Sequence, residues 1–339
     1  MRRFSSWTRA GALAALVLAQ AFVAGDARAE VSEVRIARQL GLGYLQIYVM
    51  EDQHLVEKQA QKLGLTLTAT YIALGGPGPI NDAILTGSAD YGAAGVPAFI
   101  ILWDKTRANQ QVKGVAALNA QPAFLNTNKP DIHTIKDFTD QDRIALPGVK
   151  SSYQAITLEM AAEQAFGPGQ QFKLDPLTVN LAHPDGAAAL LAGRTEITGH
   201  FTSPPFQYQE LQDPKIHRVL SSYDVIGGPA SFSAIFTTSK FRDQNPKTYQ
   251  AVLAALDEAT SFINANHDEA ARIFIKIDHS TLPQDFVKSM LDDKDIAYST
   301  TPRGVGKFTD FMARIGSIGA KPASWKELFF LDIAGKPGS

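Results

Sequence analysis

The sequence predicts an α/β protein of two lobes that the chain crosses twice. Over about the first 220 residues, short β-rich runs alternate with helical runs, the order that builds parallel sheets covered by helices. This alternation stops at an irregular stretch, residues 119–130, and then starts again. The length of 339 residues leaves room for two such units, since a domain takes about 150 residues.

The first unit has four predicted strands with a helix between each pair. The predicted strands are residues 34–37, 65–72, 89–93 and 112–118, and the predicted helices are residues 44–63, 79–85 and 97–105. Gly64 and Gly87 end two of the helices, because glycine tolerates the left-handed backbone that follows a last helical turn. Pro97 opens the third helix, since proline suits a first helical turn.

The second unit repeats this order on a smaller scale. Its predicted strands are residues 144–146, 177–182 and 197–199, and its predicted helices are residues 151–166 and 184–191. Residues 83–90 and 189–196 share the pattern A-[I/L]-L-x-G-x-x-[D/E]. In both copies a helix ends on glycine and an acidic residue precedes the next strand, which supports two similar lobes.

The last third of the chain is mostly helical. A strand at residues 231–238 precedes predicted helices at 246–264, 267–277, 284–291, 303–318 and 324–331. One strand with many helices makes no third domain, so we expect this part to return to the first lobe. The predicted boundaries are residues 30–121 with 225–339 for the first lobe and 122–224 for the second. Two crossings between lobes make a hinge.

The N-terminus carries the pattern of a signal peptide. Arg2, Arg3 and Arg9 precede an apolar stretch at residues 10–24, and Ala27-Arg28-Ala29 gives an A-x-A cleavage site. About 15 apolar residues are too few for a spanning helix, which needs about 20. We expect the Sec route, cleavage after Ala29, and a periplasmic chain without a lipid anchor, because the sequence contains no cysteine.

Composition and motifs exclude several function classes. The absence of cysteine rules out disulfides, thiol nucleophiles and Cys-ligated metals. Loss of residues 1–29 removes four arginines and one aspartate, so the mature chain has 28 basic and 33 acidic residues, net −5. This charge does not suit nucleic acid. The motifs of zinc proteases, α/β-hydrolases, P-loop proteins and dinucleotide-binding proteins are missing, and we expect no metal, no cofactor and no catalytic residues.

Glycine-rich and polar loops follow several predicted strands, where open α/β sheets bind ligands. These loops are residues 75–79, 95–97, 148–153 and 200–206. The first three expose backbone N–H groups at the positive end of a helix, an environment that suits a small anion. Ser151 and Ser152 can cap their helix or donate hydroxyls to a ligand, and both roles stay open.

At these loops the sequence resembles the periplasmic substrate-binding proteins of ABC importers in the nitrate/sulfonate/taurine group, also called the NMT1/THI5-like family. The matching stretches are RIARQLG at 35–41, GGP at 75–77, DAILTGSADYG at 82–92, GVPA at 95–98, IKDF at 135–138, RIALPGVKSS at 143–152, residues 187–196, and Pro205-Phe206. The resemblance implies the type II periplasmic binding protein fold, in which two lobes close on a small solute. It also implies a transient inner-membrane ABC permease as partner, and we expect a monomer.

Residues carried over from the family and from the loops give a candidate ligand-binding set. Its members are Gln39, Leu40, Gly41, Tyr44, Gly76, Pro77, Val96, Asn119, Gln121, Lys150, Ser151, Ser152, Tyr153, His183, His200, Thr202, Ser203 and Phe206. The expected ligand is a small sulfonate, carboxylate or nitrate-like anion, its charge held by backbone dipoles, hydroxyls and Lys150. The segment His200 to Phe206 departs from the sulfonate-binder pattern, which argues against taurine or an alkanesulfonate.

Two alternatives stay open. One is a binder of a thiamine-precursor pyrimidine or another small aromatic solute, with aromatic side chains stacked on the ring. The other is an exported enzyme that uses His183 or His200 as a base, although neither has a partner carboxylate at a recognisable spacing.

Overall fold

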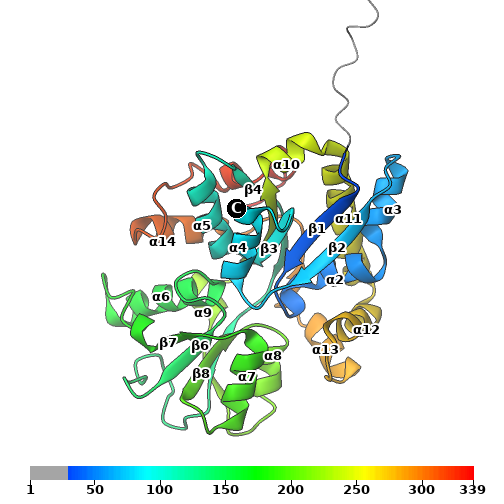
Figure 1. Ribbon diagram of the computed structural model, residues 1–339. Coiled ribbons are helices and arrows are strands. Elements are labelled where there is room, and N and C mark those ends of the chain that lie inside the picture. Colours follow the sequence, from blue (N-terminus) through cyan, green and yellow to red (C-terminus); the bar gives the residue numbers. More distant parts are fainter. Residues whose placement is uncertain (1–29) are drawn as a thin grey trace, which may run out of the picture.

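The computed structural model describes residues 30–339, and every structural statement here concerns that part of the chain (Figure 1). The predicted signal peptide, residues 1–29, lies outside the described residues. The chain forms two sheets in separate lobes, the first at the top of Figure 1 and the second at the bottom. None of the described helices is long and apolar enough to cross a membrane.

The first lobe is built on a six-stranded sheet of order β11-β4-β10-β3-β1-β2. Its strands are β1 (Glu33–Arg38), β2 (Thr68–Ala73), β3 (Tyr91–Gly95), β4 (Val112–Ala120), β10 (Ser231–Thr238) and β11 (Ala297–Tyr298). Strand β1 pairs in parallel with both β2 and β3. Strand β10 lies antiparallel between β3 and β4, so the late return of the chain completes the centre of this sheet.

Helices cover the first sheet on both faces. The helices of one layer are α2 (Leu45–Asp52), α3 (Leu55–Lys62), α11 (Pro246–Ala265), α12 (His267–Asp278) and α13 (Gln284–Leu291), in which α11 packs on α2 and α3. Those of the other layer are α4 (Pro77–Thr86), α5 (Val96–Thr106) and α14 (Val305–Arg314). The rings of Phe99 on α5 and Phe236 on β10 stack at 5.3 Å, which ties this layer to the sheet. Short helices α10 (Ser239–Gln244) and α15 (Leu331–Ala334) complete the lobe.

The second lobe has a five-stranded sheet of order β7-β6-β8-β5-β9. Its strands are β5 (Phe124–Thr127), β6 (Arg143–Leu146), β7 (Thr178–Asn180), β8 (Ile197–Thr202) and β9 (His217–Ser221), and its helices are α6 (Tyr153–Phe166), α7 (His183–Ala192), α8 (Phe206–Glu210) and α9 (Ser222–Ile226). Strand β6 pairs in parallel with β7 and β8, whereas β5 is antiparallel to both β8 and β9.

Two chain segments connect the sheets. One passes from β4 to β5, and the other from β9 through α9 to β10. They are bonded to each other where they run side by side: Ser222 N donates to Ala123 O at 2.8 Å, and Ala123 N donates to Ser222 Oγ at 2.9 Å. The lobe boundaries predicted at residues 121/122 and 224/225 fall in these segments and stay a prediction.

The two-lobed α/β fold predicted from the sequence is confirmed, with three differences. Both sheets are mixed, because strands that return from a crossing enter antiparallel. The helix predicted over residues 44–63 is two helices, since His54 takes the left-handed conformation (φ 53°) between α2 and α3. Strand β5 lies in a stretch expected to be irregular, and β9 was not predicted; pairing between these two strands orders both.

Candidate functional site

A small enclosed cavity lies between the lobes, at the carboxyl ends of strands from both sheets. It is lined by Gln39, Tyr44, Pro77, Gly95 and Phe232 of the first lobe and by Ser152, Tyr153, Gln154, His183 and Ser203 of the second. The cavity volume open to the centre of a water molecule is about 10 Å³, so the cavity holds about one water molecule. The lobes are therefore closed on each other in this structure.

Four helices begin at this cavity. Pro77 and His183 are the first residues of α4 and α7, while Gly95 and Ser152 are the N-caps of α5 and α6. The first N–H groups of a helix have no partner inside it and carry about half a positive charge. The lining therefore has a positive potential even though it contains no lysine or arginine.

Hydroxyl groups add donors to this lining. Gln39 Nε2 donates to the oxygen of Tyr44 at 2.8 Å, which leaves the Tyr44 O–H free to donate elsewhere. Burial raises the pKa of Tyr44, so this proton stays in place. Ser152 Oγ accepts from Ala155 N at 3.1 Å as the cap of α6. Its own O–H proton is therefore available as well, so Ser152 both caps its helix and offers a hydroxyl to the cavity.

His183 connects the cavity to a buried polar chain in the second lobe. Its Nδ1 lies 2.9 Å from Thr202 Oγ1 and 3.3 Å from His200 Nε2. His200 Nδ1 in turn lies 2.5 Å from Glu210 Oε1. Burial, reinforced by the nearby His200, lowers the pKa of His183 well below its ordinary value, so the His183 ring is neutral.

Aromatic rings close the other side of the cavity. The ring of Tyr153 lies 4.8 Å from that of Phe232 and 5.3 Å from that of Phe308 on α14. Phe206 stacks on His183 at 5.7 Å. A side chain of the second lobe thus inserts between two rings of the first, and this apolar contact excludes water from one wall.

Glycines bring the two lobes into backbone contact around the cavity. Leu42 N donates to Pro204 O across the cleft at 3.0 Å, and a Cβ on Gly41 would approach the same oxygen to 2.9 Å. A Cβ on Gly76 would overlap Pro147 O, and one on Gly95 would lie 3.2 Å from Tyr153 Cβ. Any side chain at Gly76 therefore opposes this closed arrangement.

The structure brings many of the sequence-predicted ligand residues together. Those that line the cavity are Gln39, Tyr44, Pro77, Ser152, Tyr153, His183 and Ser203. Those one contact away are Gly41, Gly76, His200, Thr202 and Phe206. Those elsewhere are Leu40, Val96, Asn119, Gln121, Lys150 and Ser151. The ligand-binding role of the whole set stays a prediction.

Lys150, expected to supply a positive charge, is exposed and does not line the cavity. Asn119 and Gln121 bond to each other at 3.1 Å inside the first lobe. Val96 is fully buried at the start of α5. The positive potential at the cavity therefore comes from helix ends and not from a cationic side chain.

Sequence reasoning missed Gln154, Phe232 and Glu210. Gln154 directly follows the Ser-Ser-Tyr segment at the start of α6, so its position next to predicted members could have suggested it. Phe232 belongs to β10, which enters the sheet from far along the chain. Glu210 is the partner carboxylate of His200, ten residues away, and its contact depends on how α8 packs on the sheet.

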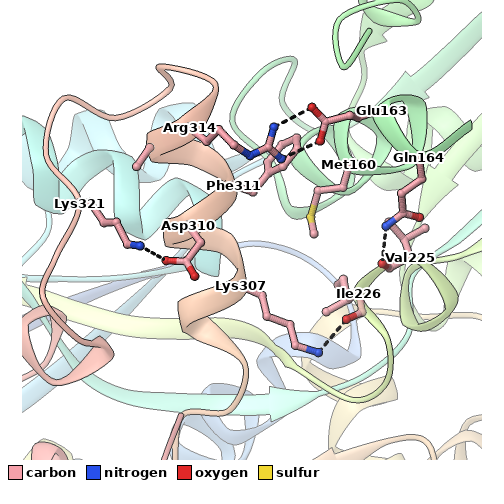
Figure 2. A pocket seen from close by; sticks show the side chains of 11 residues that line it. Met160, Glu163, Gln164, Val225, Ile226, Lys307, Asp310, Phe311, Arg314 and Lys321 are labelled. Atoms are coloured by element: carbon pink, nitrogen blue, oxygen red, sulfur yellow. Dashed lines mark hydrogen bonds and ion pairs between the residues drawn. The ribbon is translucent and has the colours of Figure 1, made fainter. Parts of the chain in front are cut away.

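A wide groove lies at the outer edge of the same interface, between α14 of the first lobe and α6 and α9 of the second (Figure 2). Its volume is about 780 Å³. Arg314 donates to both carboxylate oxygens of Glu163, at 2.7 and 2.6 Å, and Lys307 Nζ donates to Ile226 O at 2.7 Å. Figure 2 shows these contacts at the two ends of the groove.

Three solved structures of similar fold carry names that describe binding proteins. The chain is similar to the alkanesulfonate-binding protein SsuA from Xanthomonas axonopodis pv. citri bound to MOPS (TM-score 0.67, 13% identity, 86% of this chain and 96% of that chain). It is also similar to the periplasmic aliphatic sulphonate binding protein SsuA from Escherichia coli (TM-score 0.65, 17% identity, 89% and 92%). A third is the periplasmic nitrate-binding protein NrtA from Synechocystis PCC 6803 (TM-score 0.68, 16% identity, 91% and 86%).

At these low identities the structural similarity shows the fold alone: the two lobes form the periplasmic binding protein fold. A search of curated proteins found no matching relative. The sequence model of the NMT1-like family, in contrast, matches residues 29–277, which is most of the chain and includes strands of both sheets. The chain therefore belongs to the NMT1-like family.

Proposed function

We propose that this protein is the extracytoplasmic solute-binding component of an ABC importer and that it binds a small, singly charged anion between its lobes. A nitrate-like ion, a sulfonate or a carboxylate fits this description. The similar solved proteins bind nitrate, an aliphatic sulphonate or the sulfonate MOPS according to their names. Their low identity to this chain leaves the choice of ligand to the residues of the cavity.

The convergence of four helix N-termini on one cavity supports the anion most directly. The starts offer a partial positive charge and N–H donors at their non-proline positions, and Tyr44, Ser152 and Ser203 add hydroxyls. Neutral donors without a lysine or arginine suit one negative charge better than the two of a phosphate dianion. Tyr153, Phe206 and Phe232 supply the apolar wall for an organic substituent.

Binding requires the lobes to move apart and close again. The cavity has room for about one water molecule, which is too little for any of these solutes, so the solute enters an open form and then holds the lobes slightly further apart than here. The two crossing segments supply the hinge. A closed, loaded form is then the state that an inner-membrane permease recognises.

The rest of the proposal follows from this role. The chain is exported by the signal peptide of residues 1–29, works in the periplasm as a monomer, and carries out no chemical reaction. The His183, His200 and Glu210 chain is part of the binding site and not a catalytic base system, because the cavity next to it lacks a nucleophile with its own base.

A thermal-shift panel tests the proposal. The mature chain is heated with nitrate, methanesulfonate, acetate, a neutral aminopyrimidine and a neutral sugar. A ligand that binds only the folded state at 100 times its Kd adds about 2.7 kcal/mol to the free energy of unfolding. We expect at least one anion to raise Tm. A rise with the pyrimidine alone would favour the aromatic-solute alternative, and a rise with the sugar alone would contradict both.

A further inference from the structure

Behind His183 lies a buried pair of ionisable side chains, His200 and Glu210, whose role simple anion binding does not explain. His200 and Glu210 are both fully buried, and their side chains meet at 2.5 Å. Asn126 Nδ2 donates to the second carboxylate oxygen of Glu210 at 2.8 Å. A carboxylate in this position is costly unless its partners are fixed. Because Glu210 lies behind the cavity-lining His183, we expect it to determine which ring nitrogen of His183 carries the proton.

The order of donors and acceptors along the chain follows from Glu210. An ionised Glu210 only accepts, so His200 Nδ1 carries a proton and donates to it. In a neutral His200, Nε2 then accepts from His183 Nδ1, which lies 3.3 Å away. His183 Nε2 is left as an acceptor, and the amide nitrogen of Gln154 faces it at 3.3 Å. In this state His183 Nε2 accepts from the Gln154 amide, and His183 offers no N–H to an anion in the cavity.

One added proton reverses this order. It bonds to His183 Nε2 from the cavity, the Gln154 amide turns its N–H group away from that nitrogen, and the proton on His183 Nδ1 passes to His200 Nε2. His200 becomes an imidazolium that donates to both Glu210 and His183, while His183 stays neutral and now carries its N–H at Nε2. Thr202 Oγ1, 2.9 Å from His183 Nδ1, accepts in the first state and donates in the second by turning its hydroxyl.

Among residues 30–339, no other charged group in contact with the two rings competes for this proton. Gln154 of α6, Thr202 of β8, Asn126 of β5 and the ring of Phe206 on α8 are neutral. Asp185, in the first turn of α7, is exposed. Across the cavity, the first lobe offers the neutral Gln39 and Tyr44. Glu210 is thus the counter-charge of the protonated chain.

We infer that the chain His183–His200–Glu210 takes up a proton when an anion enters the cavity, and so supplies the positive charge that the lining lacks. The inference rests on the proposed function and adds to it: the ligand is held as an anion together with a proton. Glu210 and His200 act as positioning residues for His183, which touches the ligand.

Calorimetric titration of the mature chain tests this directly. Nitrate and methanesulfonate are titrated at several pH values in buffers of different ionisation enthalpy, which gives the protons taken up per anion. We expect uptake to approach one proton, and the anion affinity to fall about tenfold per pH unit where the free chain is unprotonated. In Glu210→Gln the imidazolium loses its counter-charge, so uptake and the pH dependence are lost. His133→Gln, at an exposed histidine of the same lobe, is the control and keeps both.

Nitrogen-15 NMR of the histidine rings supplies a second readout in the unaltered protein. The free protein is expected to show His183 protonated at Nδ1, and the anion-bound protein to show His183 protonated at Nε2 with His200 doubly protonated. Anion binding without proton uptake and without this change overturns the inference alone. Failure of every anion in the panel to bind overturns the proposed function, and the inference with it.

Discussion

Arg314 and Glu163 join the two lobes through a bidentate ion pair, with N–O distances of 2.7 and 2.6 Å. Arg314 ends α14 of the first lobe, and Glu163 lies in the last part of α6 of the second (Figure 2). The paired Arg314 guanidinium holds the pKa of Glu163 below its ordinary value. Since the partners sit on different lobes, this pair exists only when the lobes are closed.

Arg314→Gln should therefore favour the open form. An exposed pair contributes about 0.2–1 kcal/mol, so we expect anion affinity to fall by a factor between about 1.4 and 5, with little change in the free protein's Tm. Arg272→Gln is the matched control, because Arg272 forms a similar pair with Glu269 inside α12 alone. Calorimetric titration of the three proteins measures the effect, and equal affinities would show that the pair does not hold the lobes together.

The same pair gives closure a dependence on pH. Because the pKa of Glu163 is lowered in the paired state, the pair stabilises the closed form above the ordinary value of 4.5. This contribution is lost as pH falls through the lowered pKa. We expect the affinity difference between the native protein and Arg314→Gln to be constant near neutral pH and to vanish in acid. A difference that stays constant however far the pH falls below 4.5 would contradict the assignment.

Gly76→Ala should block closure without disturbing either lobe. Gly76 has an extended backbone (φ −172°) that alanine adopts without strain. Its Cβ would instead overlap Pro147 O of the other lobe. We expect Tm of the free protein to change little and anion affinity to fall at least tenfold, since closure must forgo well-packed contacts.

Gly78→Ala is the control for this change. Gly78 lies in the same helix start, and a Cβ there meets nothing within 4 Å. Small-angle scattering with saturating ligand separates the two variants, because only Gly78→Ala should become as compact as the native protein. Normal compaction of Gly76→Ala would show that this backbone contact is not needed for closure.

Tyr44→Phe tests the hydroxyl donors of the cavity. Its O–H is free to donate, because the Tyr44 oxygen already accepts from Gln39. A hydrogen bond to a charged group contributes about 1.5–3 kcal/mol, so we expect anion affinity to fall by about tenfold or more. Tyr71→Phe removes a buried hydroxyl that has no partner and lies outside the cavity. It should leave the affinity unchanged, and an equal loss in both variants would speak against direct contact.

Glu159 should make the second lobe less stable at alkaline pH. Burial, together with the nearby Asp175, raises the pKa of Glu159 to about 8, and its Oε2 has no hydrogen-bond partner. The folded chain then keeps a proton that the unfolded chain releases above the ordinary value of 4.5. The free energy of unfolding therefore falls between these two pH values, by up to about 1.4 kcal/mol per pH unit.

Glu159→Gln should remove this fall. Tm measured from pH 5 to pH 8 is expected to decline less in the variant than in the native protein. Glu196→Gln, at an exposed position of the same lobe, is the control and should keep the native slope. An unchanged slope in Glu159→Gln would mean that Glu159 is ionised in the folded protein.

The sequence predicted those parts of the fold that depend on local pattern. Helix α13 begins and ends as expected, and Gly87 closes α4 with a left-handed backbone. Parts that depend on distant pairing were missed. Strand β5 is short and is ordered by pairing with β8 on one side and β9 on the other. The break at His54 separates α2 from α3, and both of these helices pack on α11, which is about 190 residues further along the chain.

In the candidate site, too, residues indicated by local sequence pattern were predicted, and residues placed by contacts distant in the sequence were missed. Loops after strands indicated Pro77, Ser152 and His183, because the edge of a sheet is a property of topology. Lys150 was expected to face the ligand on account of its charge, but its left-handed backbone (φ 61°) accompanies an exposed position away from the cavity. Glu210 could not be found by spacing, since its contact with His200 runs between a strand and a helix packed on it.

Native mass spectrometry of the mature protein, purified gently from its own cells, tests whether a small anion occupies the cavity between the lobes. The measurement weighs the solute that stays between the lobes, and the released solute is then titrated back onto the protein and onto Gly76→Ala. We predict a small acid with a single negative charge that binds the native protein and binds Gly76→Ala at least tenfold more weakly. A neutral pyrimidine or sugar that rebinds both proteins equally would contradict the account.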